Sequence, residues 1–524
     1  MRNKVLEDHK MKRKLFLSIL LCAYIFIHIK TLLTFPLMHS DEAWLGGLSL
    51  EYLIQKSPFV TEPFFDLFPR SPHLLKVFFH GIQAIFIALF GYGLFPLRLI
   101  SLIFGLIGLY VFYRILIQVK LRPDFALLGV LLLATNIQFI YATHFARQEI
   151  ILFTLLVFCY YLVVENSKTT ILASGLIIGL GVGFHPNAFI LSLMIGTCIL
   201  LNVIYGKLSF KLLLFWGSIV GVVALIFPLT TLAINPSFVQ DYYAYGKTLS
   251  VDAPFLQRFA NMVAFYQKIF WQISGTYYLP NVRPVFYSLF FLFISSFFTK
   301  SYQKLYWRHA FGMLIAFNAG VFIIGRYNTT SIVFIIFPWC LMVALEVTTL
   351  VKKIPLLKRY RFWSAFVCVC VLSISSLLPL YKDINAMSYA NYAVYEQQIK
   401  EHLATEGAIL GNLSSGFVFA GRDFYDIRNL AYLDKNMLGK YIAKHNIQTI
   451  IYYEEYDYIH RNTMWEILYG SDDHYYDQMQ EFLSQYGTNV YAFEAPYYGT
   501  RIIRYMGDYP WKIYIYHIQD MPTY

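Results

Sequence analysis

Residues 15–37 read LFLSILLCAYIFIHIKTLLTFPL, an apolar run that is long enough to cross a lipid bilayer as one helix. Six lysine and arginine residues stand in the segment 1–14 that precedes it. The run is longer than the core of a typical signal peptide, and it has no clear small-residue cleavage site. The sequence therefore predicts an uncleaved first transmembrane helix whose N-terminus lies in the cytoplasm.

The whole chain shares this apolar character. Of its 524 residues, 58% are hydrophobic and only 14% are charged, whereas soluble domains carry about 25% charged residues. Residues 1–381 have 31 basic and 13 acidic side chains, and residues 382–524 have 11 basic and 18 acidic ones. This division excludes a soluble cytosolic enzyme, a disordered chain and a nucleic-acid-binding protein. It predicts a polytopic α-helical membrane protein with an acidic C-terminal domain.

Eleven apolar stretches are candidate transmembrane helices. They are 15–37, 97–118, 125–145, 149–164, 169–186, 187–205, 210–234, 285–299, 309–325, 330–350 and 362–381. The stretch 74–93 is left out because Lys76, His80 and Gln83 interrupt it, and we expect it to be a juxtamembrane or re-entrant helix. With this topology the cytoplasmic segments hold 20 basic residues and the longer outer segments hold ten. The positive-inside rule then places residues 382–524 outside the cytoplasm.

Two outer loops are long, 38–96 and 235–284, and long structured loops often carry function. The tail is predicted to form a small α/β domain, with strands at Gly407–Gly411 and Ile447–Tyr453 and a helical segment at Leu438–His445 between them.

All six cysteines fall in apolar segments with no metal-ligand spacing. Disulfide bonds and a zinc site are therefore not expected.

Acidic residues are rare before residue 382, so their positions are informative. Asp41 and Glu42 directly follow the first span, and Glu149 begins the fourth span just after Arg147. Ionisable groups at such depth are costly unless they face a cavity or a partner. Two other interpretations stay open: Asp41 and Glu42 can stabilise a helix N-terminus, and Arg147 with Glu149 can form an interfacial ion pair.

Several motifs resemble those of the GT-C glycosyltransferases, in the branch that holds protein O-mannosyltransferases and the lipid A aminoarabinose transferase. In chain order they are HSDEAW at 39–44, LSLEYL at 48–53, SPHLL at 71–75, RLIS at 98–101, ATN at 134–136, ARQE at 146–149, FHP at 184–186, and Arg326-Tyr327 with Pro338. The resemblance covers nearly all of residues 1–350. Ser71 stands where the family has a basic residue, so Arg70, His73 or Lys76 would replace it.

The resemblance implies a GT-C fold with about 11 transmembrane helices, in a catalytic domain 1–381 and an extracytoplasmic α/β domain 382–524. It also implies transfer of a monosaccharide from a polyprenyl-phosphate-linked donor to an acceptor hydroxyl at the outer face, with inversion. Asp41 is the expected base, and Glu42 and Glu149 are further candidate catalytic carboxylates. The candidate substrate-binding residues are Arg70, His73, Lys76, Arg147, His185, Asp241, Tyr242, Arg326 and Tyr327.

The expected partners are the lipid-linked donor, a glycan, lipid or protein acceptor, and membrane lipids, in a bacterial plasma membrane. No cofactor is implied, although a divalent cation stays open. A metal-dependent oligosaccharyl transferase would need a cluster of acids, which Asp41, Glu42, Glu149 and Asp241 could supply. A transporter or flippase would show an inverted repeat, and a binding module on an inert anchor would need far fewer spans. The identities of the sugar and the acceptor stay open.

Overall fold

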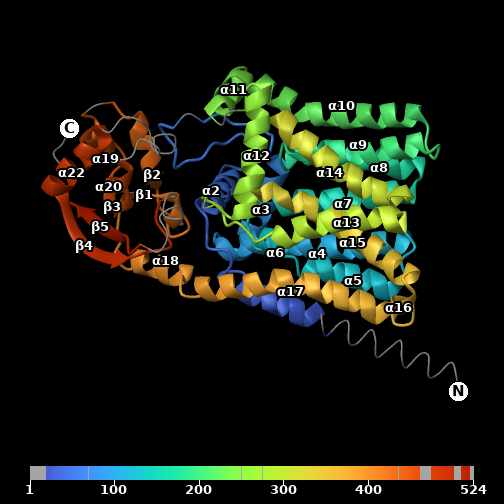
Figure 1. Cartoon of the computed structure of the whole chain (residues 1–524). Coiled ribbons are helices and arrows are strands. Elements are labelled where there is room, and N and C mark those ends of the chain that lie inside the picture. The colour runs from blue at the N-terminus through green and yellow to red at the C-terminus, as the bar shows by residue number, and fades with distance from the viewer. Residues whose placement is uncertain are drawn as a thin grey trace.

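The computed structural model describes residues 19, 21–68, 70–248, 251–273, 275–419, 421–434, 436–460, 474–500 and 509–519. Long helices lie side by side in a bundle, and a mixed α/β domain stands at one end of it (Figure 1). The helices of the bundle are Leu21–Thr31, α4 (Leu94–Gln118), α5 (Pro123–Ala134), α6 (Ile137–Thr143), α7 (Glu149–Glu165), α8 (Lys168–Leu180), α9 (Ala188–Ile204), α10 (Phe210–Ile234), α13 (Arg283–Thr299), α14 (Leu305–Ile324), α15 (Val333–Lys353) and α17 (Arg361–Met387).

The bundle contains helices that can cross a membrane. Within the described residues, five are long and apolar enough, or six if the bent pair α5 and α6 forms one span. Shorter apolar helices, among them Leu21–Thr31, α9 and α13, lie beside them. An integral membrane protein is therefore supported, whereas the count of eleven spans stays a prediction. The N-terminal part of the predicted first span lies outside the described residues.

The predicted span 125–145 is broken. Its two helices, α5 and α6, are bent by 68°. The side chain of Asn136 accepts hydrogen bonds from the backbone N–H groups of Gln138 and Phe139, at 3.0 and 3.1 Å. This N-cap starts α6 as a new helix. The break directs the chain across the end of the bundle toward Arg147.

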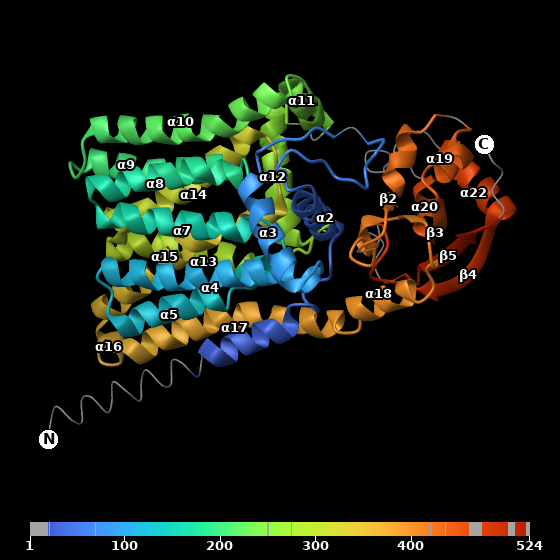
Figure 2. The same cartoon turned by 180° about the vertical axis from the view of Figure 1, so that it is seen from behind.

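Four helices lie outside the parallel bundle: α2 (Ser40–Gln55), α3 (Val77–Phe90), α11 (Phe238–Thr248) and α12 (Phe255–Trp271). Figure 2 shows that α3 and α12 run across the end of the bundle that faces the α/β domain. This orientation agrees with the prediction that 74–93 is a juxtamembrane helix.

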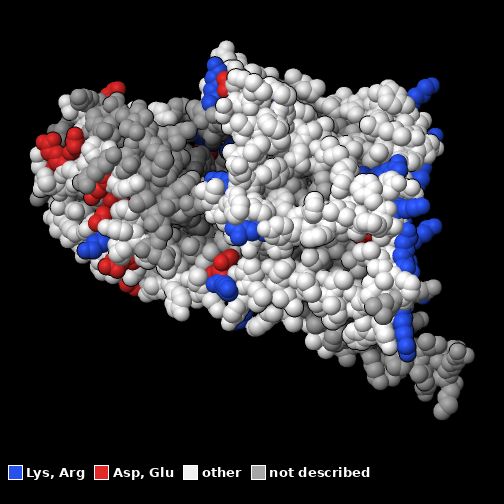
Figure 3. All heavy atoms as spheres, in the orientation of Figure 1, with Lys and Arg blue, Asp and Glu red and all other residues white. Residues whose placement is uncertain are grey.

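The charges on the surface are segregated. In Figure 3, lysine and arginine side chains gather at the end of the bundle far from the α/β domain, and acidic side chains gather on that domain. The short helix α16 (Pro355–Lys358) lies at the basic end. By the positive-inside rule this end is expected to face the cytoplasm.

The C-terminal domain is built on a five-stranded sheet with the order β2-β1-β3-β5-β4. Strands β2, β1 and β3 are parallel, and β5 is antiparallel to both β3 and β4. The two predicted strands and the predicted helix between them correspond to β1, β3 and α19. The elements are α18 (Tyr392–Lys400), β1 (Ala408–Gly411), β2 (Phe424–Asp426), α19 (Leu438–Lys444), β3 (Ile447–Tyr453), α20 (Glu455–His460), α22 (His474–Tyr486), β4 (Gly487–Glu494) and β5 (Lys512–Ile518).

This domain is attached to the outer loop 38–96 by specific contacts. The carbonyl oxygen of Phe64 accepts from the backbone N–H of Asp426 at 3.0 Å and from the side chain of Asn429 at 2.8 Å. Asp66 accepts from the hydroxyl of Tyr441 at 2.8 Å and lies 3.0 Å from the ring of His445. The loop therefore holds the domain through its backbone as well as its side chains.

A buried glutamate makes the C-terminal domain sensitive to pH. Glu455 is fully buried after β3, accepts the backbone N–H of Thr500 at 3.0 Å, and has a second carboxylate oxygen without a partner among the described residues. Burial raises the pKa of Glu455 to about 8. The folded domain therefore holds this proton, and its stability declines as pH rises from the unfolded value toward about 8.

Glu455→Gln should remove this decline, because glutamine has the shape of the protonated acid and no charge to bury. We expect the protection of β1 and β3 in hydrogen-exchange mass spectrometry to fall between pH 5 and 8 in the wild type, by up to about 5 kcal/mol, and to stay level in the variant. Glu454→Gln is the matched control and should keep the wild-type pH dependence. Equal pH dependence in the wild type and Glu455→Gln would contradict the expectation.

Candidate active site

The first turn of α2 sends two neighbouring carboxylates in different directions. His39 is the N-cap of α2, and its ring accepts the backbone N–H of Asp41 at 3.0 Å. The carboxylate of Glu42 reaches back to accept the backbone N–H of His39 at 3.0 Å. This reciprocal capping box fixes the start of the helix. Glu42 thereby points into the protein, and Asp41 points toward the segment before α7.

The carboxylate of Glu42 forms a buried ion pair that stabilises the fold. Arg98 of α4 grips both of its oxygens at 2.8 Å, and both side chains are 0% exposed. The backbone N–H of Ala146 donates to the same carboxylate at 2.9 Å, and Arg98 also donates to the carbonyl oxygens of Leu32 and Pro36. A buried carboxylate with every position occupied is not available to substrate. The geometry therefore gives no support to the catalytic role expected for Glu42.

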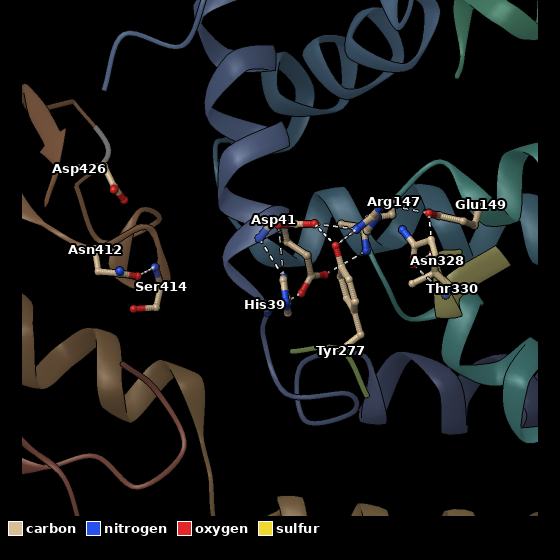
Figure 4. A network of polar contacts seen from close by, with 12 residues as sticks. His39, Asp41, Arg147, Glu149, Tyr277, Asn328, Thr330, Asn412, Ser414 and Asp426 are labelled. Carbon is tan, nitrogen blue, oxygen red and sulfur yellow. Dashed lines mark hydrogen bonds and ion pairs between the residues drawn. The ribbon is translucent and has the colours of Figure 1, made fainter. Parts of the chain in front are cut away.

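Asp41 belongs to a compact polar triangle, drawn in Figure 4. Arg147 Nη1 lies 2.6 Å from Asp41 Oδ2, and the hydroxyl of Tyr277 donates to the same oxygen at 2.6 Å. Arg147 Nη1 also donates to the hydroxyl of Tyr277 at 2.6 Å. The side chains of Asp41 and Arg147 are 15% and 9% exposed. Asp41 is thus held firmly at a partly accessible position.

Glu149 shares the same arginine. Its Oε1 lies 3.0 Å from Arg147 Nη2 and accepts the hydroxyl of Thr330 at 2.8 Å. Its other oxygen, Oε2, is buried and has no hydrogen-bond partner among the described residues. One guanidinium therefore bridges Asp41 and Glu149. The contact of Arg147 with Glu149 agrees with the interpretation that these two residues form an ion pair.

A set of basic side chains lies around this network, and we call it the basic cluster. Its members are Arg70, His73, Lys76, Arg147, His185 and Arg326. Burial and the positive charges of Arg147, Arg70 and Arg326 lower the pKa of Lys76 to about 8, although Asp41 acts in the opposite direction. Burial, followed by the charge of Lys76, lowers the pKa of His73 to about 4, so this ring is neutral near pH 7. The ammonium group of Lys76 and the guanidinium groups near it disfavour one another's positive charge, and such a site favours the binding of an anion.

Lys76 is the member best placed to bind that anion. It stands at the N-cap of α3, and its ammonium group has no hydrogen-bond or ion-pair partner within the described ranges. Arg326 is exposed in the segment between α14 and the short helix Thr329–Ile332. An unpaired ammonium beside other cations is stabilised when a phosphate group arrives.

Arg70, which the sequence also offers as a phosphate ligand, is engaged elsewhere. It binds both oxygens of Glu62, at 2.7 and 3.0 Å, and stacks on the ring of Trp44 at 5.1 Å. Burial alone would raise the pKa of Glu62, but the charge of Arg70 lowers it to about 2. Arg428 of the C-terminal domain lies 4.9 Å from the same indole ring. Arg70 therefore joins the outer loop to that domain.

The remaining candidates make contacts with residues outside the network of Asp41, Arg147 and Glu149. Asp241 of α11 accepts the hydroxyls of Ser71 and Ser237, each at 2.7 Å, and thereby ties α11 to the segment after Arg70. The hydroxyl of Tyr327 donates to the carbonyl oxygen of Arg258 at 2.7 Å. Tyr242 is 46% exposed on α11.

Within the described ranges no group of three or more histidine, cysteine or acidic side chains could hold a metal ion.

Sequence reasoning missed three residues of this site. Arg98 was visible only as part of the RLIS motif, and nothing in that motif showed its pairing with Glu42. Tyr277 lies 236 residues from Asp41 in the chain and carries no motif. Thr330 lies shortly after Arg326 and Tyr327, and the sequence motif indicated a role only for those two residues. Contacts between distant loops of this kind have no local sequence signal.

Comparison with known proteins agrees with the GT-C resemblance. Residues 77–233 match the family model of dolichyl-phosphate-mannose-protein mannosyltransferase. ArnT from Cupriavidus metallidurans bound to undecaprenyl phosphate is similar in structure, with a TM-score of 0.55 at 12% identity over 97% of this chain and 99% of ArnT. The apo state of the same protein has a TM-score of 0.55 at 12% identity over 96% and 98% of the two chains.

The oligosaccharyltransferase of Archaeoglobus fulgidus, tethered with an acceptor peptide, has a TM-score of 0.49 at 13% identity, over 92% of this chain and 73% of its own. No curated protein sequence matches the chain. The family match and the full-length likeness to ArnT confirm the resemblance drawn from the motifs. The chain therefore has the fold of the GT-C glycosyltransferases and carries, over residues 77–233, the sequence pattern of their protein mannosyltransferase family.

Proposed function

We propose that the protein transfers a monosaccharide from a polyprenyl-phosphate-linked donor to an acceptor hydroxyl at the outer face of the membrane, with inversion at the anomeric carbon. The observation that carries this proposal is the position of Asp41 beside a basic cluster in which Lys76 has no hydrogen-bond or ion-pair partner among the described residues. Transfer of a sugar from a glycosyl phosphate requires a base for the acceptor hydroxyl and a positively charged site for the leaving phosphate. The undecaprenyl phosphate bound to ArnT supports the same class of donor.

The proposed chemistry follows from these positions. The carboxylate of Asp41 takes the proton of the acceptor hydroxyl as its oxygen forms a bond with the anomeric carbon. The bond from that carbon to the phosphate oxygen breaks, and its electron pair leaves with the polyprenyl phosphate, which gains one negative charge. Lys76, with Arg326 and His185 nearby, stabilises this charge through electrostatic interactions and hydrogen bonds. Attack opposite the leaving phosphate gives inversion.

The arrangement of the chain supports residues 1–381 as the catalytic domain and 382–524 as an extracytoplasmic domain. The helices α2 and α3 lie at the end of the bundle that faces the α/β domain (Figure 1), and the basic side chains gather at the opposite end (Figure 3). This arrangement is expected if the site faces outward in a bacterial plasma membrane. Asp41 and Glu149 both lie at the end of the bundle that faces the α/β domain. This placement favours transfer chemistry over a transport path through the membrane.

The test uses the purified full chain with a panel of polyprenyl-phosphate sugars and a mixture of glycan, lipid and peptide acceptors. We expect release of polyprenyl phosphate from at least one donor, dependent on an acceptor and on Asp41. Addition of a chelator separates metal-independent from metal-dependent transfer. No release from any donor, in protein that remains folded, would contradict the proposal.

A further inference from the structure

We propose that Tyr277 is a positioning residue for Asp41, and this inference rests on the proposed function. Tyr277 lies in the segment between α12 and α13. Its hydroxyl donates to Asp41 Oδ2 at 2.6 Å, the oxygen that Arg147 also grips at 2.6 Å. Two different segments of the chain therefore contact the same carboxylate oxygen: the segment before α7, through Arg147, and the segment before α13, through Tyr277.

Three hydrogen bonds within this triangle use both protons of Arg147 Nη1 and the hydroxyl proton of Tyr277. Arg147 Nη1 has two protons, of which one goes to Asp41 and the other to the hydroxyl oxygen of Tyr277. The proton of Tyr277 goes to Asp41 Oδ2. Two hydrogen bonds with fixed directions therefore converge on one carboxylate oxygen and restrict the rotation of the side chain. A base held in this way needs little reorganisation when the acceptor arrives.

The ring of Tyr277 is held as firmly as its hydroxyl. It stacks on the ring of His39, with 4.5 Å between the centroids and 16° between the planes. The guanidinium of Arg147 lies 5.1 Å from the centre of the same ring. His39 is also the N-cap of α2, so Tyr277 contacts both the base and the residue that starts the helix carrying it (Figure 4).

The next residue anchors the segment to a different element. The hydroxyl of Tyr278 donates to a carboxylate oxygen of Asp383 on α17. The ring of Tyr278 lies edge-on to Phe35 and Tyr141, at 5.1 and 5.2 Å. The two adjacent tyrosines therefore have different contacts: Tyr278 attaches the segment between α12 and α13 to α17, and Tyr277 contacts the carboxylate of Asp41. This pair supplies a matched control, because both residues can lose a hydroxyl from the same segment.

A hydrogen bond donated to a carboxylate favours its charged form. Among the described residues, the charged and titratable groups that face Asp41 include His39 on α2, Lys76 at the start of α3, Arg147 before α7, and Tyr277. Glu149 at the start of α7 shares Arg147 with it. Tyr277→Phe removes one of them and leaves the others in place. Asp41 should then keep its proton to a higher pH, and the acid limb of the pH–rate profile should move to higher pH.

The experiment measures kcat and kcat/KM against pH for the full chain with an active polyprenyl-phosphate sugar, in the wild type, Tyr277→Phe, Tyr278→Phe and Asp41→Asn. Tyr277→Phe should lower kcat roughly tenfold and shift the acid limb upward by about half a pH unit or more. Its KM for the donor should stay within about twofold, since the phosphate is bound elsewhere. Tyr278→Phe should leave the acid limb where it is in the wild type.

The outcomes separate the inference from the function on which it rests. Wild-type turnover with an unshifted acid limb in Tyr277→Phe would overturn the positioning role alone. The same shift in both tyrosine variants would also overturn it, since the effect would then belong to the segment and not to one hydroxyl. Absence of wild-type turnover with every donor would overturn the proposed function, and the inference with it.

Discussion

Replacing Asp41 by asparagine is expected to lower turnover by about 10²–10⁴-fold, the range typical of a lost general base. Asparagine keeps the size of the side chain and an oxygen that can accept from Arg147 and Tyr277. It cannot take the proton of the acceptor hydroxyl. Binding of the donor should change little, because the phosphate contacts come from the basic cluster. Turnover is measured as release of polyprenyl phosphate, and binding by titration with the donor.

Glu42→Gln is the contrasting control, since it changes the neighbouring carboxylate in the same way. Glu42 is buried against Arg98, so its loss should reduce the amount of folded protein. Breaking a buried ion pair costs about 3–5 kcal/mol. Asp41→Asn should instead leave thermal stability and expression close to the wild type. Near-normal turnover in Asp41→Asn would identify the acid as a helix-capping residue and would make Glu149 the next candidate base.

Replacing Lys76 by alanine is expected to weaken donor binding by about 10–100-fold, because a charge-assisted hydrogen bond contributes about 1.5–3 kcal/mol. The rate should fall as well, since the same ammonium group stabilises the leaving phosphate. Lys56→Ala is the control: Lys56 is exposed at the end of α2, away from the basic cluster. Unchanged donor affinity in Lys76→Ala would leave Arg326 and His185 as the phosphate ligands.

The same lysine predicts a pH dependence. Its pKa of about 8 in the free protein means that the ammonium loses its proton as pH rises through that value. Donor affinity should therefore be high below about pH 8 and decline above it. Lys76→Arg keeps the charge at all these pH values. Whatever its affinity at pH 7, this variant should lack the alkaline decline, and an equal decline in both proteins would assign the titration to another group.

The order of elements was predictable because it depends on local composition. Apolar length identified the bundle, and the polar interruptions of 74–93 predicted a helix apart from it, which agrees with the orientation of α3 across the end of the bundle. Arg147 and Glu149 could be paired because they are two residues apart in the chain. Proximity in sequence was sufficient in these cases.

The choice among chemically similar residues was not predictable. Asp41 and Glu42 are neighbours, and on a helix neighbouring side chains point in directions about 100° apart. Only the position of Arg98 decides which of them is buried. The same holds for Arg70 and Lys76, because Glu62 pairs with Arg70, whereas Lys76 has no partner in the part of the chain that the structure describes. Tyr277 depends on a loop that meets α2 only in the folded protein.

The indole ring of Trp44 contacts Arg70 from the outer loop and Arg428 from the C-terminal domain. Phe64 and Asp66 of that loop meet Asn429 and Tyr441 of the domain. The tail is therefore not a module that can be exchanged by joining two chains at residue 381. A chimera between relatives should carry the loop and the tail from the same parent. Residues 44–70 and 426–445 should therefore be exchanged together, although more than 350 residues separate them in the chain.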